Sequence, residues 1–330
     1  MKGIFRKLFK HKGGSRFIVQ PGDKQRENMV YYEMSGETRR AHRSWYRGKH
    51  TNFHPVRASL AEPDAFANHV GKGWLPPAPF IDKNTYIAAF GSCFAAHVTK
   101  FLAKEGYNVF GRNLRIDSHI VRSGEGIVNT AALRQQFEWA LAGAAAAAGQ
   151  WHDKAGVELE VSETVRKETH RIFEETEVFI LTLGLSEIWY DKETGAPFWK
   201  GVPKDSFDDT RHGFRVIGVA ENLENLERVR ELIRAHRPEA TIVLTLSPVP
   251  LAATFRPVSC ITANAVSKAS LRMAIDELMR AHEDDERLFY FPSYEMITAF
   301  LPDPYEDDLR HPKPAAVNEV MRAFQAAYLR

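Results

Sequence analysis

A run of six uncharged residues near the middle of the chain, Val178 to Leu183, most constrains the fold. A strand that is apolar on both faces must be covered on both sides, which is typical of the interior of a parallel sheet. The segments Thr241 to Leu246 and Leu288 to Phe291 have the same character, and amphipathic helical patterns separate them. Strands alternating with helices predict a three-layer α/β/α domain with a mostly parallel sheet, in which ligands bind at the carboxyl ends of the strands.

Two more strands and four helices are expected from the same patterns, in addition to the helix after Ser92 that is described below. Tyr86 to Phe90 and Tyr107 to Phe110 are the strands. The first of these helices spans Ala131 to about Ala146. The second has apolar positions from Leu223 to Ile233 and ends before Pro238. The apolar positions of the third run from Leu271 to Met279, and those of the last from Val317 to Phe324.

The segment from Tyr86 to Ala95 is a strand that passes through a Gly-Ser corner into an amphipathic helix. Gly91 permits a tight backbone at the end of the strand, and Ser92 stands where a helix N-cap belongs. The free amide groups and the positive dipole end of a helix favour an anion or an oxyanion there. Ser92 is therefore either an ordinary cap or a nucleophile.

A carboxylate and an imidazole stand three residues apart in Asp308-Leu309-Arg310-His311, just before the last helix. In a turn, this spacing brings an Asp oxygen to His Nδ1 and leaves Nε2 free to accept a proton from a serine. With Ser92, the pair gives the chain order Ser, Asp, His. A solvated turn is the ordinary alternative for such a pair.

Gly91 to Ala95 spells GSCFA, and the sequence resembles the GSCFA-domain family within the broader SGNH/GDSL-like hydrolase and esterase superfamily. The resemblance covers about residues 75 to 325. It implies a flavodoxin-like SGNH hydrolase fold, with Ser92 as nucleophile and His311 as a base oriented by Asp308. Further stretches that agree with it are Thr182 to Trp189, Leu246 to Leu251, Asn264 to Arg272 and Asp308 to His311.

Two loops offer donors for an oxyanion hole. Related hydrolases use a Gly amide and an Asn side chain, which makes Gly126 and Asn129 candidates, although Gly-rich turns usually need no function. Gly184, Ser186 and Glu187 follow the central strand and should reach the same rim as Ser92. Here the chain departs from the superfamily's common Gly-x-Asn-Asp pattern, so the Ser186 hydroxyl, Asn129 or backbone amides alone could serve, and Glu187 either contacts substrate or forms a structural ion pair.

The chain has 330 residues, 44% of them hydrophobic and 26% charged, which suffices for one large α/β domain with an extension or for two small domains. We expect a basic N-terminal arm over residues 1–75 and a hydrolase domain over 76–330. Residues 191–218 show few helix or strand signals and are interpreted as an insertion over the site. Aromatic residues in this segment and just before it would stack on sugar rings or cover a core edge; they are Trp189, Tyr190, Phe198 and Trp199.

The two cysteines, Cys93 and Cys260, form no disulfide framework, and no spacing indicates zinc. A reducing compartment fits this usage best. Cys93 is an alternative nucleophile, but a Cys in an apolar corner is more often a small buried residue. No metal or organic cofactor is expected.

Positive charge is concentrated at the start of the chain. Residues 1–60 hold fourteen Lys and Arg against four Asp and Glu, so the net charge of +2 hides a basic arm and an acidic remainder. Residues 1–14 are either a basic interfacial helix or a solvated tail. No segment suits a transmembrane helix or a signal peptide. We expect a cytoplasmic protein with peripheral contact at the inner face of the membrane; nucleic acid is a poor third choice for the basic and aromatic residues 38–57.

The sequence therefore favours a serine-dependent carboxylic ester hydrolase or O-acyltransferase that acts through an acyl-enzyme on acylated or acetylated glycans. The alternative is a non-catalytic glycan-binding or scaffold protein that retains the hydrolase fold, which the missing Gly-x-Asn-Asp loop favours.

Overall fold

The structure is a computed structural model that describes residues 29–35, 37–42, 50, 52, 54–55, 59–91, 93–116, 129–146, 151, 157–158, 161–199 and 201–330. The chain divides into two compact units, Met1–Gly73 and Trp74–Arg330. In the first, β1 (Met29–Met34) pairs antiparallel with β2 (Glu37–His42). Two short helical turns follow, η1 (Ser59–Ala61) and η2 (Phe66–Val70).

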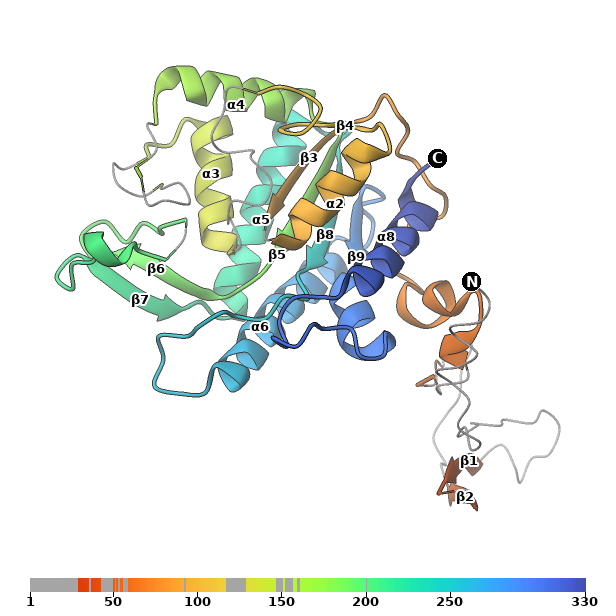
Figure 1. Cartoon of the computed structure of the whole chain (residues 1–330). Helices are drawn as coiled ribbons and strands as arrows, with labels where there is room; N and C mark the ends of the chain where they lie inside the picture. Colours follow the sequence, from red (N-terminus) through yellow and green to blue (C-terminus); the bar gives the residue numbers. More distant parts are fainter. Residues whose placement is uncertain are drawn as a thin grey trace. The chain divides into compact units, whose positions relative to one another are not determined.

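A five-stranded sheet in the order β4-β3-β5-β8-β9 forms the centre of the second unit (Figure 1). Every neighbouring pair in it is parallel, so the predicted α/β class with a mostly parallel sheet is confirmed. The middle strands have no exposed residue, which is why their sequences are apolar throughout. The strands are β3 (Tyr86–Gly91), β4 (Asn108–Val109), β5 (Val178–Leu183), β8 (Thr241–Leu246) and β9 (Leu288–Phe291).

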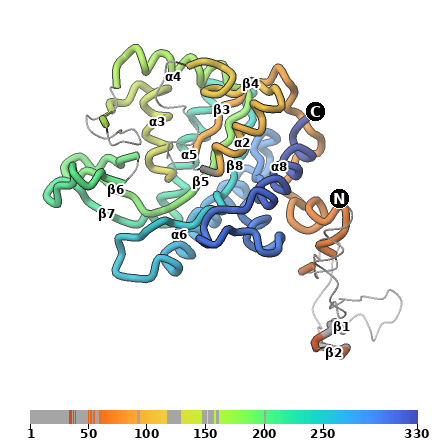
Figure 2. Tube along the Cα trace, in the orientation of Figure 1, coloured from red at the N-terminus to blue at the C-terminus, as the bar shows by residue number. Residues whose placement is uncertain are grey.

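Helices cover both faces of this sheet (Figures 1 and 2). α2 and α8 lie against one face, and α3, α5 and α6 pack side by side on the other, with α4 beside α3. The last residue of the chain is bonded to the segment before β3, since the Arg330 amide donates to the Ile81 carbonyl. The helices are α2 (Cys93–Lys104), α3 (Thr130–Ala142), α4 (Glu163–Glu175), α5 (Val219–His236), α6 (Cys260–Ala281), α7 (Ser293–Glu295), η4 (Met296–Phe300) and α8 (Pro314–Tyr328).

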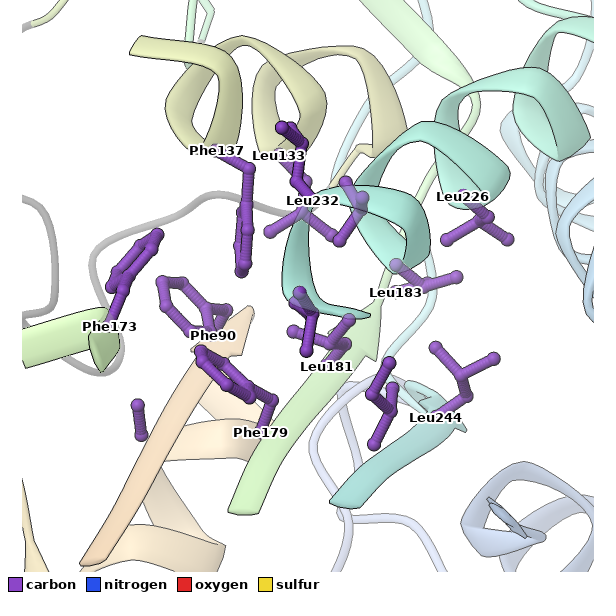
Figure 3. Packing of buried hydrophobic residues seen from close by; sticks show 14 of the residues in the cluster. Phe90, Leu133, Phe137, Phe173, Phe179, Leu181, Leu183, Leu226, Leu232 and Leu244 are labelled. Carbon is purple, nitrogen blue, oxygen red and sulfur yellow. The ribbon is translucent and has the colours of Figure 1, made fainter. Parts of the chain in front are cut away.

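The larger part of the core lies between the sheet and the α3 side (Figure 3). Phe90 and Phe179 project from neighbouring strands toward Phe137 of α3 and Phe173 of α4, and the rings of Phe137 and Phe173 lie 4.6 Å apart. Burying a Phe side chain contributes about 2 to 3 kcal/mol, so this cluster ties α3 and α4 to the sheet.

Three local features differ from expectation. The helix expected to reach about Ala146 ends at Ala142, because Gly143 adopts a left-handed conformation with φ of 68° and donates to the Glu138 carbonyl. α4 was not expected; Ser162 caps it by accepting from the Val165 amide.

The third difference is in residues 191–218, where few strand signals were expected. β6 (Glu187–Asp191) and β7 (His212–Val216) form an antiparallel ribbon there, with a short turn, η3 (Lys204–Ser206), between them. Gly213 is needed in β7 because a Cβ at this position would collide with the ring of Tyr190 opposite. In the described part of the chain, no helix is both long and apolar enough to cross a membrane.

Candidate active site

The turn from Asp308 to His311 joins the two side chains directly. The His311 Nδ1 atom lies 2.5 Å from Asp308 Oδ2, and the backbone amides of Arg310 and His311 each donate to Asp308 Oδ1 over 2.9 Å. The His311 amide, then its ring, then the Arg310 amide lower the pKa of Asp308 to about 2. Ionised Asp308 selects the tautomer with a proton on Nδ1 and a lone pair on Nε2.

Arg310 fixes the turn to the loop after β8. Its Nε donates to the Pro250 carbonyl over 3.1 Å, and its Nη1 lies 3.5 Å from His311 Nε2. The Tyr305 hydroxyl adds a 2.8 Å bond to the Pro248 carbonyl. About half of each side chain of the pair is exposed, with 48% for Asp308 and 51% for His311. The imidazole is therefore held in place but open to solvent and substrate.

His97 lies in the first half of α2, the helix that follows β3. Burial, Lys100 and then His311 lower the pKa of His97. His97 is one turn after Cys93, the first residue of α2. α2 begins where β3 ends, and the Asp308–His311 turn is bonded to the loop after β8, so both lie at the carboxyl ends of the parallel strands.

Ser92 and Gly126, the expected nucleophile and one expected oxyanion donor, lie outside the described residues. The backbone on both sides of Ser92 is described: β3 ends at Gly91, and α2 begins at Cys93. Gly91 pairs with Thr182 of β5 and has φ of 126°, which an L side chain rarely adopts.

Asn129 and Gly184 both have structural contacts. The Asn129 side chain accepts from the Ala132 amide as the N-cap of α3, and it also lines a cavity described below. The Gly184 carbonyl, at the end of β5, accepts a hydrogen bond from the Lys268 ammonium. Both residues are buried.

Ser186 is fully buried and bonded inside the protein. Its amide donates to Ser267 Oγ over 2.6 Å, its hydroxyl donates to the Ser267 carbonyl over 3.2 Å, and Asn222 donates to that hydroxyl. These bonds hold the loop after β5 on α5 and α6. They also leave the amide and the hydroxyl no proton to offer to a substrate.

A cavity of about 260 Å³ lies beside this loop. Most of its wall is apolar and aromatic, and Glu187 and Asn129 are its polar side chains. The Glu187 carboxylate accepts from the Thr254 hydroxyl at 2.8 and 3.0 Å. The lining residues are Asn129, Leu185, Glu187, Ile188, Trp189, Phe198, Trp199, Gly201, Phe214, Leu251, Ala253 and Phe255.

The aromatic residues of the expected insertion divide into two groups. Phe198 and Trp199 are each 3% exposed, and Trp199 stacks on Trp151 with ring centroids 4.3 Å apart. They cover the core. Trp189 is only partly buried, and its ring lies 4.8 Å from that of Phe255 at the cavity. Trp189 therefore offers an aromatic surface to a ligand.

Lys268 is a site-supporting residue that the sequence analysis did not single out. Its ammonium donates to the carbonyls of Gly184, Ser247 and Val249 over 2.7, 2.7 and 2.9 Å, which joins the loops after β5 and β8. Burial and, less strongly, Arg310 lower its pKa to about 7. Its position in the sequence could have indicated this role, because Lys268 is three residues before Leu271 and seven before Ile275, on the apolar face of α6.

The match to the GSCFA family spans residues 86–324, well over half of the chain, and the protein belongs to that family. A search of curated proteins finds no match. Among the solved structures that match the chain are the following three.

The first comes from Streptococcus pneumonia and is provisionally described as a platelet activating factor. It is 13% identical to this chain with a TM-score of 0.40, and the alignment covers 73% of this chain and 84% of that protein. A carbohydrate esterase family 3 protein from Talaromyces cellulolyticus has 10% identity and a TM-score of 0.35, with coverage of 75% and 92%. A Clostridium thermocellum family 3 carbohydrate esterase has 10% identity and a TM-score of 0.33, with coverage of 74% and 93%. At this similarity, the three names do not decide the reaction of this chain.

Proposed function

We propose that the protein is a serine-dependent carboxylic ester hydrolase or O-acyltransferase that acts on acylated glycans. The observation that carries the proposal is the Asp308–His311 pair, whose short Oδ2 to Nδ1 contact directs Nε2 away from Asp308, with Arg310 Nη1 3.5 Å from it, at the strand ends where β3 leads into α2. A serine at the corner before α2 is the group that the Nε2 lone pair would deprotonate.

In the proposed reaction, His311 Nε2 takes the hydroxyl proton of Ser92 as the oxygen attacks the ester carbonyl, and Asp308 stabilises the imidazolium. Amides of Ser92 and Gly126 would bind the oxyanion. The imidazolium then gives its proton to the leaving alcohol. Water or a sugar hydroxyl attacks the acyl-enzyme, and His311 again takes the proton. The bond from the acyl carbon to the Ser92 oxygen then breaks, His311 returns the proton to that oxygen, and the acyl group leaves as an acid or a new ester.

The cavity supports a sugar-sized substrate group. Its volume of about 260 Å³ lies just below the usual range for ligand pockets, which suits one ring better than an extended oligosaccharide. Trp189 and Phe255 offer flat apolar faces, and the Glu187 carboxylate could accept from a sugar hydroxyl. We propose that this cavity binds the acylated sugar.

Intact-protein mass spectrometry after exposure to a fluorophosphonate tests the serine mechanism. We expect a single adduct on the wild type that is lost in Ser92→Ala and His311→Ala. Cys93→Ala and His282→Ala should keep it, since the first controls for a thiol nucleophile and the second removes a histidine bonded to Glu227 between α5 and α6.

An adduct that persists in Ser92→Ala would contradict the proposal. No adduct on folded wild-type protein would favour the glycan-binding alternative, for which the internal bonding of Ser186 is the supporting observation.

For residues 1–14, which lie outside the described residues, we propose peripheral contact with an anionic membrane at the cytoplasmic face. Cosedimentation with anionic vesicles should fall when these residues are deleted. Equal binding by the full and the shortened chain would remove the arm from the proposal.

A further inference from the structure

Two histidines and a glutamate gather where α4 and α5 end. His170 and Glu174 are one turn apart on α4 and share a face, and His236 is the last residue of α5. One ligand atom from each of the three lies within 4.8 Å of the others. Segments 66 residues apart in the sequence thus bring together a set of side chains that binds metal ions.

The separations distinguish this group from a hydrogen-bonded pair. His170 Nδ1 lies 3.6 Å from Glu174 Oε2, and His236 Nδ1 lies 3.9 Å from Glu174 Oε1. Both distances are too long for a hydrogen bond. Ligand atoms about 2.0 to 2.1 Å from a tetrahedral zinc ion would lie about 3.4 Å from each other, so small side-chain rotations would suffice. By contrast, His282 at the end of α6 and Glu227 of α5 form a direct bond of 2.7 Å.

The surroundings also favour a cation. The carboxyl ends of α4 and α5 each carry partial negative charge, and the three side chains lie in or beside these final turns. The side chains are partly open, with 32% of His170, 51% of Glu174 and 28% of His236 exposed. An ion could therefore enter from solvent and keep a water ligand.

The cluster lies at the amino ends of the strands, whereas the candidate active site lies at their carboxyl ends. α4 leads into the amino end of β5 and α5 into that of β8, whereas Asp308 and His311 are fixed to the loop after the carboxyl end of β8. An ion bound by the cluster would therefore link α4 to α5 without reaching the proposed reaction.

We propose that His170, Glu174 and His236 form a binding site for Zn²⁺ or a similar late first-row divalent ion, with water in the remaining position. Two imidazole nitrogens select such ions over Mg²⁺ and Ca²⁺, which prefer oxygen ligands. Binding fastens the end of α4 to the end of α5.

Equilibrium dialysis of the full, tag-free and chelator-treated chain against Zn²⁺ tests this site. The wild type should bind one Zn²⁺ that His236→Ala and Glu174→Gln each weaken by about 100-fold or more. His282→Ala is the matched control, because it removes a histidine from another helix–helix contact, and it should bind as the wild type does. Circular dichroism of the metal-free variants checks that each is folded.

Co²⁺ provides a second measurement. In the wild type it should give the visible absorption of a four-coordinate site, and Zn²⁺ should displace it; Glu174→Gln should lose this signal although it remains folded. A wild type that binds no Zn²⁺ would overturn the proposal, and so would undiminished binding by the folded His236→Ala and Glu174→Gln variants.

Discussion

Gly91 lies so close to Thr182 on the neighbouring strand that no other residue fits at its position. A Cβ there would overlap the Thr182 carbonyl oxygen and lie 2.7 Å from Thr182 Cβ. The backbone φ of 126° adds a penalty for any L side chain. Gly91→Ala should therefore lower the free energy of unfolding by about 3 kcal/mol or more, as measured by urea denaturation.

Gly143→Ala separates the two causes. Gly143 also has a positive φ, of 68°, but nothing lies within 4 Å of the position that an added Cβ would occupy. Only the conformational penalty of about 1 kcal/mol is expected there. Equal losses in the two variants would mean that contact with Thr182 is unimportant.

The central strands could be predicted because their signal is local. β5 and β8 are buried on both faces, so every residue from Val178 to Leu183 and from Thr241 to Leu246 had to be compatible with the interior. The observed bounds of both strands are the expected ones. The length predicted for α3 was too great, because the alanines after Gly143 favour a helix, whereas Gly143 itself ends it.

The support of the candidate site depends on contacts between distant residues. Ser186 bonds to Ser267 and Asn222, and Lys268 joins carbonyls of two loops, across separations that no local pattern records. The Asp308–His311 contact is different, since its three-residue spacing made it accessible to sequence reasoning. The sequence analysis missed β7 because the fit of Gly213 against the Tyr190 ring exists only when β6 and β7 are paired.

Replacing Lys268 should destabilise the fold strongly. Lys268→Met leaves two buried carbonyls and one partly buried carbonyl without the ammonium that satisfies them, and each unsatisfied buried group costs about 1 to 3 kcal/mol. We expect a loss of about 3 kcal/mol or more in urea unfolding. Arg280→Met, on the same helix but 65% exposed, should change stability by less than about 0.5 kcal/mol. A small loss for Lys268→Met would show that water can replace the lysine.

The β6–β7 ribbon should lose stability in acid through Asp191. Hydrogen bonding to Arg211, then to the Thr194 and Glu193 amides, lowers its pKa to about 2. A lowered carboxyl pKa stabilises the folded state above the unfolded value near 3.8, and this contribution is lost as the pH falls toward 2.

Asp191→Asn should therefore cost about 2 kcal/mol at pH 7, and its difference from the wild type should narrow below about pH 4. Urea unfolding between pH 7 and pH 3 measures the difference. Asp205→Asn, an exposed aspartate in the same segment, is the control. A difference that does not change with pH would exclude the charge on Asp191 as its cause.

The aromatic wall of the cavity should affect substrate binding more than chemistry. Phe255→Ala removes a ring 4.8 Å from Trp189 that is 61% exposed and lines the cavity. The KM for an acylated glycan should rise about tenfold with little change in kcat, since an aromatic contact contributes about 0.5 to 1.5 kcal/mol. Ile261→Ala, at another exposed apolar position, should leave both constants unchanged. A fall in kcat alone would argue against a binding role.

Asp308→Asn distinguishes orientation of His311 from mere proximity. Asn cannot stabilise an imidazolium, and its amide nitrogen can donate to Nδ1, which would leave the proton on Nε2 and block acceptance of the serine proton. We expect kcat to fall by about 100-fold to 10,000-fold, with KM for the ester little changed.

The pH profile supplies the second readout. Because the pKa of Asp308 is about 2, this carboxylate is ionised at every pH above the strongly acidic range, and its titration cannot account for a loss of activity near neutrality. Any change of the Asp308→Asn deficit between about pH 5 and pH 8 should therefore come from groups other than the Asp308 carboxyl. Asp303→Asn, an exposed aspartate paired with Lys313 nearby, should retain full activity. Wild-type kcat in Asp308→Asn would mean that His311 needs no carboxylate partner.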